Sequence, residues 1–145
     1  MTHLKQIPAT ATYIVRQPIL RNGMPIETCR FNGDDDTTTT HFGFFESENL
    51  LGVVSLFETK NEAFIAEKQF QIRGMAVLET HQKKGIGNAL ILQCETFATQ
   101  QGAAVVWFNA RETAVPFYIK MGFEILGTSF EIENIGTHYV MFRKY

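Results

Sequence analysis

Residues 73–88 read RGMAVLETHQKKGIGN, and this stretch decides the fold because the hydrophobic period changes within it. The pattern predicts a strand over residues 70–77, a short polar loop, and a helix that begins at Gly85. Apolar residues then recur at spacings of three and four until Gly102, namely Ile86, Leu90, Ile91, Cys94, Phe97 and Ala98. A strand followed by an amphipathic helix indicates a sheet that is covered by helices.

Further strands and helices are predicted on both sides of this stretch. Upstream, the pattern favours a strand over 11–16, a helical turn over 17–21, and a hairpin with arms 41–46 and 51–58. Residues 32–40 are interpreted as a solvated loop, since they lack the ligand pattern of a calcium loop. Downstream we expect a buried strand over 103–109, a short helix over 112–121, and closing strands over 123–132 and 138–145. The prediction is therefore an α/β protein with a mixed β-sheet, formed by a single domain over residues 1–145.

Composition and charge exclude several classes of protein. Hydrophobic residues make up 45% and charged residues 19%, which excludes a disordered tail or a coiled coil. A net charge of -2 gives no basic field for nucleic acid or an anionic membrane. No apolar run reaches the roughly 18 residues of a membrane span, and no signal-peptide pattern is present, so we expect a cytoplasmic protein. Cys29 and Cys94 have no partner at ligand spacing, so neither a disulfide nor a metal site is predicted.

The start of the predicted helix has the features of a phosphate-binding site. A helix N-terminus presents unpaired N–H groups and partial positive charge, and Gly85 and Gly87 let an anion approach the backbone. Lys83 and Lys84 add full positive charges beside it. The Walker A pattern does not fit, and the dinucleotide fingerprint fails because Leu90 replaces its third glycine. A strand-to-helix turn without any ligand explains the same residues equally well at this point.

Two motifs add a family resemblance to this interpretation. Gln82-x-x-Gly85-x-Gly87 resembles the Q/R-x-x-G-x-G/A loop of the GCN5-related N-acetyltransferase (GNAT) superfamily. Downstream, Asn109-Ala110-Arg111-Glu112 and the run FYIKMGF over 117–123 resemble that family's N-x-x-A…FYxKxGF pattern. The resemblance extends from Arg16 to Met141. Residues 16–21, Asp34, His41 and the ending 131–138 are similar to the ElaA-like subgroup.

The resemblance implies the GNAT fold and acetyl-CoA as cosubstrate. No metal is expected, since the sequence holds no cluster of ligand residues. In that fold the strand that ends at Val77 separates from its neighbour and offers backbone groups to the pantetheine arm. The Val77 N–H would point at the thioester oxygen, where negative charge develops. The loop from Gln82 to Asn88 would hold the pyrophosphate. The residues implied for the cofactor are Met75, Ala76, Val77, Gln82, Lys83, Lys84, Gly85, Ile86, Gly87, Asn88, Asn109, Phe117 and Tyr118.

The implied reaction is direct acetyl transfer in a ternary complex, to a small-molecule amine or to a protein N-terminus or lysine. Tyr118 is the predicted acid that protonates the leaving thiolate, and packing beside Phe117 is its open alternative. His138 is the first choice for the base that deprotonates the amine. The other candidates for the base are His41, Glu46, Glu58 and Glu131.

Several interpretations stay open at this point. Arg16, Arg21 and Arg73 are predicted to be ordinary salt-bridge partners, with binding of a substrate carboxylate as the alternative. In the implied fold, residues 17–40 and 133–137 border the acceptor site, and two copies pair through the C-terminal strands. A non-catalytic acyl-CoA-binding sensor and a protein interaction domain that reuses the fold are the alternatives to an enzyme.

Overall fold

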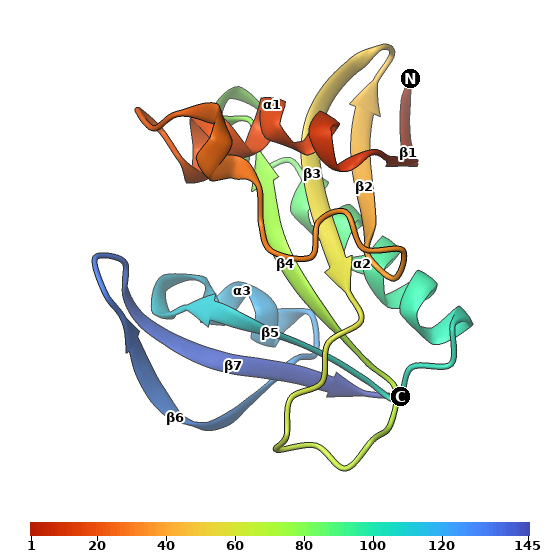
Figure 1. Ribbon diagram of the computed structural model, residues 1–145, viewed down its shortest axis with the longest axis vertical. Helices are drawn as coiled ribbons and strands as arrows, with labels where there is room; N and C mark the ends of the chain where they lie inside the picture. The colour runs from red at the N-terminus through yellow and green to blue at the C-terminus, as the bar shows by residue number, and fades with distance from the viewer.

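The computed structural model describes all 145 residues, which form one seven-stranded sheet. The strands lie in the order β1-β2-β3-β4-β5-β7-β6 (Figure 1). Neighbouring strands are antiparallel except β4 and β5, which run parallel. Their bounds are β1 (Thr2–Ile7), β2 (Thr40–Glu46), β3 (Asn49–Phe57), β4 (Gln69–Val77), β5 (Val105–Arg111), β6 (Glu124–Ile132) and β7 (Gly136–Lys144).

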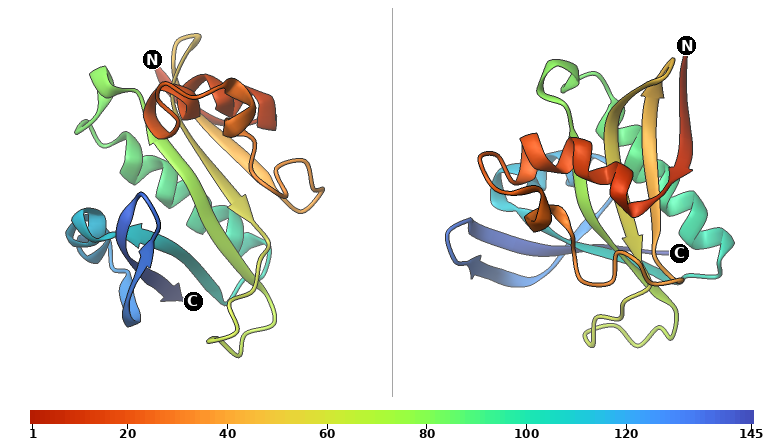
Figure 2. Two further views of the ribbon diagram at one scale, coloured as in Figure 1. Left: turned by 60° about the vertical axis from the view of Figure 1, so that its left-hand side comes forward. Right: turned by 45° about the horizontal axis from the view of Figure 1, so that its top comes forward.

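Helices cover both faces of the sheet (Figure 2). α1 packs mainly on β3 and β4, and α2 packs against β2, β3 and β4 from the other side. The main core lies under α2, where Leu90, Ile91 and Cys94 are fully buried, and a smaller core lies under Val15 of α1. The helix bounds are α1 (Ala9–Leu20), η1 (Ile26–Cys29), η2 (Glu79–His81), α2 (Ile86–Gln100), η3 (Glu112–Ala114) and α3 (Val115–Lys120), the η helices being short 3₁₀ helices. None of the helices is both long and apolar enough to span a membrane.

The parallel pair β4 and β5 separates soon after it begins. Its ladder joins only residues 69–71 to residues 105–107, although β4 continues to Val77 and β5 to Arg111. Figure 1 shows the two strands diverging from a common point near the C-terminus. The far ends of the two strands are therefore not paired with one another, and a cleft opens between them.

A bulge in β4 accompanies this separation. Gly74 and Met75 together stand opposite Val54 of β3, because the register passes from Ser55–Arg73 to Val53–Ala76. Gly74 has a φ of +66°, and a Cβ at this position would lie 2.7 Å from the ring of Phe31. Only glycine fits this bulge, which turns β4 away from β5.

The strand that we predicted over residues 11–16 is wrong, because this segment lies within α1. Its β-branched residues favour a strand, but the buried residues of α1 are Ala9, Thr12, Val15 and Arg16. Those positions follow helical spacing, so packing of one helix face on the sheet overrides the local propensity. The helical turn predicted over 17–21 is the end of the same helix.

The other predicted elements are confirmed with small changes of their bounds. The hairpin, the strand before the loop, the long helix and the closing strands all lie where the sequence placed them. β5 continues two residues beyond the predicted end at Asn109, and the predicted helix over 112–121 consists of η3 followed by α3. We missed β1, an edge strand whose sequence is largely polar and exposed. β6 forms the opposite edge, and pairing of two copies through the C-terminal strands stays a prediction.

Candidate functional site

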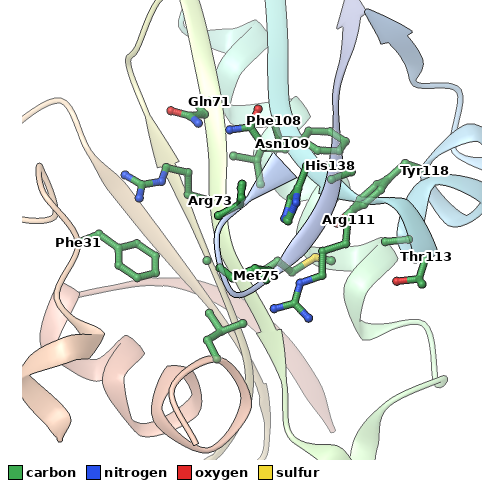
Figure 3. A pocket seen from close by; sticks show the side chains of 17 residues that line it. Phe31, Gln71, Arg73, Met75, Phe108, Asn109, Arg111, Thr113, Tyr118 and His138 are labelled. Carbon is green, nitrogen blue, oxygen red and sulfur yellow. The ribbon is translucent and has the colours of Figure 1, made fainter. Parts of the chain in front are cut away.

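A cleft of about 400 Å³ opens between the separated ends of β4 and β5 (Figure 3). One wall is β4 and the opposite wall is β5, while α3 and β7 contribute one lining residue each, Tyr118 and His138. The polar and aromatic residues that line it include Phe31, Gln71, Arg73, Asn109, Arg111, Thr113, Tyr118 and His138. The cleft therefore brings Tyr118, His138, Met75 and Asn109 of the predicted site together.

A second cavity, of about 390 Å³, lies at the start of α2. It is lined by the predicted phosphate loop and by one aromatic residue of α3, namely by Val77, His81, Gln82, Lys83, Gly85, Ile86, Gly87, Asn88 and Phe117. Lys84 is exposed and does not line it. Phe117 and Tyr118 are adjacent in α3 and line one cavity each, so α3 links the two parts of the site.

The backbone of the loop leaves the start of α2 open to a ligand. Gly85 is the N-cap residue and has a φ of +83°, while Lys83 has a φ of +63°. No side chain caps α2, so the first N–H groups of the helix have no partner from a capping residue. A Cβ at Gly85 would meet no atom within 4 Å, so the positive φ rather than crowding requires glycine there.

Gln82 does not cap α2 but bonds to the end of β4. Its side-chain Nε2 donates a hydrogen bond of 2.9 Å to the carbonyl oxygen of Val77. This bond ties the loop back to the last residue of β4. It fixes the position of Val77 relative to the phosphate loop.

The backbone amide of Val77 points toward the open side of β4. The N–H of Leu78 donates to the carbonyl of Leu51 in β3, at 2.9 Å, and Val77 stands opposite Gly52. Because successive amides of a strand point to opposite sides, the Val77 N–H is directed away from β3. That side faces the gap where β5 has already separated from β4.

Tyr118 is partly buried among aromatic rings at the edge of the cleft. Its ring centroid lies 4.4 Å from that of Phe108 and 5.0 Å from that of Phe117. Burial raises the pKa of the Tyr118 phenol to about 12. Tyr118 therefore has both features that the sequence left open. Its ring packs on Phe108, and the residue also lines the cleft.

His138 lines the same cleft and is buried, with 5% of its surface exposed. Its Nδ1 lies 2.8 Å from the carbonyl oxygen of Gly136, and a carbonyl only accepts, so Nδ1 carries the proton. The neutral ring then has its lone pair on Nε2. A histidine held in this tautomer has the free nitrogen that a general base requires.

The other four candidates for the base lie outside the cleft lining. His41 is buried, and its nitrogens contact Ser55 Oγ at 2.6 Å and the Asp34 carbonyl at 2.9 Å, so neither is free. Glu131 accepts a hydrogen bond from the hydroxyl of Thr137. Glu46 and Glu58 are exposed at the ends of their strands.

Arg16 is confirmed as a salt-bridge partner, in a fully buried pair with Asp34. Arg16 Nη1 lies 2.6 Å from Asp34 Oδ2, and the guanidinium also donates to the Cys29 carbonyl and to Ser55 Oγ, both at 2.8 Å. The network continues from Ser55 to His41. Our prediction of a solvated loop over 32–40 is therefore wrong for Asp34, which closes this network.

Arg21 and Arg73 do not form the salt bridges that we predicted. Arg21 donates to the carbonyl oxygens of Leu20 and Thr28 and has no carboxylate partner. Arg73 lines the cleft and has no ion pair, because both oxygens of Asp34 are occupied by Arg16. Our sequence reasoning also missed Arg111 as a cleft residue. Side chains two residues apart in a strand lie on the same face, so Arg111 shares a face of β5 with Asn109. This spacing could have identified Arg111 from the sequence.

Comparison with known proteins identifies the class to which this fold and site belong. The family model of the acetyltransferase (GNAT) domain matches residues 27–143. Among curated proteins, the uncharacterized N-acetyltransferase YitI of Bacillus subtilis is 33% identical over 144 residues, which cover 99% of this chain and 96% of YitI. The chain therefore belongs to the GNAT family and is an acetyltransferase.

Solved structures show the same fold at low sequence identity. A putative N-acetyltransferase from Lactobacillus plantarum superposes with a TM-score of 0.81 at 15% identity, covering 99% of this chain and 97% of that one. The ribosomal-protein-S18-alanine N-acetyltransferase from Escherichia coli gives a TM-score of 0.78 at 16% identity, covering 99% and 94%. An aminoglycoside 6'-N-acetyltransferase complexed with coenzyme A gives 0.77 at 11% identity, covering 98% and 96%. The mixed GNAT fold that the sequence predicts is confirmed.

Proposed function

We propose that this protein transfers the acetyl group of acetyl-CoA to a primary amine by direct attack within a ternary complex. One observation carries the proposal: the free amide of Val77 faces the gap between a helix N-terminal phosphate loop and a cleft that holds His138 and Tyr118. That arrangement would supply a cofactor cradle, an oxyanion donor, a base and an acid from two cavities that α3 links.

The residues at the start of α2 fit the diphosphate of a coenzyme A molecule. The uncapped N–H groups of α2 and the positive end of its dipole attract an anion. Gly85 and Gly87 keep the loop backbone accessible, and Lys83 adds positive charge to the lining. Along β4, the backbone of Met75, Ala76 and Val77 would hold the pantetheine arm, with Asn109 and Phe117 beside it.

The reaction then needs three groups of this chain. His138 Nε2 takes a proton from the substrate ammonium, and the amine nitrogen attacks the acetyl carbonyl to form the new C–N bond. The Val77 N–H stabilises the negative charge that develops on the carbonyl oxygen, an effect worth a few kcal/mol of barrier, about 3, when the donor is fixed. As the C–S bond breaks, Tyr118 donates its hydroxyl proton to the departing sulfur, and the resulting phenolate takes up the second proton that the nitrogen loses as the amide forms. A pKa of about 12 keeps this phenol protonated throughout an ordinary assay.

The two cysteines support direct transfer rather than a covalent acyl-enzyme. Cys29 and Cys94 are both fully buried. Burial raises the pKa of each thiol, so the nucleophilic thiolate is disfavoured at neutral pH. Neither residue lines the cleft.

The test combines ligand binding with turnover. Thermal unfolding is measured with acetyl-CoA and coenzyme A, and with NAD and ATP as controls, and thiol release is then followed with a panel of amines. Ligand at 100 times its Kd adds roughly 2.7 kcal/mol of stability, so we expect a shift of several degrees with the two coenzyme A species alone. Amine-dependent thiol release establishes the enzyme. Binding without any release would indicate a non-catalytic acyl-CoA sensor, and the absence of both would overturn the proposal.

A further inference from the structure

The cleft between β4 and β5 carries positive charge and no carboxylate. Its 17 lining residues include Arg73 and Arg111 but no Asp or Glu. Neither arginine takes part in the ion pairs of the protein, which join Arg16, Arg30, Lys60 and Arg143 to acidic residues. An acceptor with several positive charges would find no counter-ion in this cleft, whereas an anionic group would find two.

Arg73 is a half-buried cation that forms no ion pair. Its guanidinium carbon lies 4.9 Å from the ring centroid of Phe31 and 5.1 Å from that of Phe57. The carboxylate of Asp34, which acts on it electrostatically, has both oxygens bonded to Arg16. Burial lowers the pKa of the Arg73 guanidinium, but arginine remains charged at physiological pH. A partly desolvated charge of this kind is satisfied when a ligand supplies the anion.

Arg111 approaches the same space from the opposite wall. It stands directly across from His138 in the ladder between β5 and β7. In Figure 3, His138 and Arg111 lie together on one side of the cleft, and the Arg73 guanidinium lies on the other side, near Phe31. The lining of one cleft therefore contains the candidate base and two guanidinium groups that form no ion pair.

We propose that the acceptor is a primary amine that also carries a carboxylate or phosphate group, and that Arg73 and Arg111 bind this anion while His138 receives the amine proton. The inference rests on the proposed function, and it names the substrate class of the same cleft. Both kinds of anion match the planar donor fork of arginine. The apolar part of the acceptor would contact Leu20, Phe31, Ile132 and Ile135, which line the cleft around the arginines.

The geometry of β4 limits the size of the acceptor. Arg73 lies four positions before Val77, and a strand rises about 3.3 Å per residue, so their Cα atoms are at most roughly 13 Å apart. The bulge at Gly74 shortens that span further. The anion and the amine of the acceptor should therefore be separated by a short spacer, as in an amino acid or a small aminoalkyl phosphate.

The experiment uses matched amines that differ only in the anion. Thiol release from acetyl-CoA is compared for α-, β- and γ-amino acids and for the primary amide of each, together with phosphoethanolamine and ethanolamine. We expect kcat/KM to be at least about tenfold higher for the anionic member of the preferred pair, which is the scale of a charge-assisted hydrogen bond. The amino acids and phosphoethanolamine separate carboxylate recognition from phosphate recognition, and the spacer series gives the preferred length.

Variants of the two arginines then link the preference to the cleft. Arg73→Gln and Arg111→Gln should each lower the ratio of kcat/KM between anionic and neutral acceptors toward one, through a higher KM for the anionic member. Arg73→Lys, which keeps charge but loses the fork, should retain part of the ratio. Arg30→Gln is the matched control, because Arg30 forms an exposed ion pair with Asp35 outside the cleft. Arg111 is exposed, so its variant separates loss of recognition from loss of folding.

Failure of this inference is distinguishable from failure of the proposed function. If neutral or polycationic amines are the better acceptors, or if Arg111→Gln leaves the ratio unchanged, the acceptor class is wrong and the acetyltransferase stands. If no amine is turned over, thermal unfolding with coenzyme A plus each amine gives the same comparison, and no extra stabilisation by the anionic members overturns the inference. If coenzyme A itself causes no shift, the proposed function fails first.

Discussion

The two halves of the cleft are built from different kinds of group. The proposed cofactor half is the cavity at the start of α2, which is lined mostly by one continuous stretch from Val77 to Asn88, and its shape depends on glycines and on the start of α2. The acceptor half consists of side chains from segments far apart in the chain, including Phe31, Arg73, Arg111 and His138. Main-chain binding leaves a short motif in the sequence, whereas a site assembled from distant side chains leaves none. The comparison predicts that substitutions in the acceptor half act on chemistry and selectivity, and those in the cofactor half on coenzyme A affinity.

The largest expected effect comes from the base in the acceptor half. His138→Gln removes the free ring nitrogen and should lower kcat by about 10²–10⁴-fold, with an unchanged Kd for acetyl-CoA. Steady-state thiol release and a thermal-shift titration measure the two quantities. His3→Gln is the control, since His3 stacks on Phe45 at the β1 edge of the sheet. A His138→Gln variant with more than half the normal kcat would assign proton removal to water.

The buried pair that supports the acceptor half should have the largest effect on stability. Arg16→Met leaves the Asp34 carboxylate buried without a counter-charge and with the Phe31 N–H as its remaining donor, which should lower the free energy of unfolding by about 3–5 kcal/mol. Arg30→Met breaks a neighbouring exposed pair with Asp35 and should cost less than about 1 kcal/mol. Denaturant unfolding compares the two variants. Equal losses would mean that Asp34 reaches water, contrary to its full burial.

The sequence predicted the strand, loop and helix of the proposed cofactor half well, because these elements are contiguous in the chain. The Gln82 to Asn88 loop, the preceding strand and the long helix all lie where we predicted them. The acceptor half was predicted only in part. His138 lines the cleft, and its role stays a prediction. Arg21 and Arg73 do not form the predicted salt bridges, because only the three-dimensional fold shows that Arg16 binds the Asp34 carboxylate and that Arg21 donates to backbone carbonyl oxygens. The assignment of residues 11–16 failed for a related reason, since tertiary burial and not local propensity makes them helical.

Tyr118 lies at the junction of the two halves and should have an intermediate effect. Tyr118→Phe keeps the ring on Phe108 and removes the proton donor, so kcat should fall by about 10²-fold, the lower end for acid catalysis, because a raised pKa weakens the acid. The active form is the protonated one, which is lost only as the pH approaches the pKa of about 12. The rate should therefore show no decline due to Tyr118 below about pH 11. Tyr139→Phe is the control, since Tyr139 lies outside the cleft lining.

A pH–rate profile of both proteins checks the assignment of Tyr118. Tyr118→Phe should lower the rate at every pH, while the pH at which the rate begins to decline on the alkaline side stays the same. A decline between pH 8 and 10 that disappears in Tyr118→Phe would show that the phenol has a lowered rather than a raised pKa when acetyl-CoA is bound, and the role of Tyr118 would have to be revised.

The smallest expected effect concerns the glycines of the cofactor half. It tests whether Gly87 lowers the stability of the ligand-free protein while keeping the backbone accessible to acetyl-CoA. Gly87 lies in α2 with no positive φ, and a Cβ there would meet Met75 Cε at 3.6 Å, an ordinary contact. Gly87→Ala should therefore raise the stability of the ligand-free protein by about 0.5–1 kcal/mol, while the added methyl in the cavity weakens acetyl-CoA binding. Gly85→Ala should instead lower stability, because alanine is strained at a φ of +83°. Melting temperatures with and without acetyl-CoA measure both effects, and a Gly87→Ala variant that binds acetyl-CoA as tightly as the natural sequence would show that the loop backbone at this position is not part of the cradle.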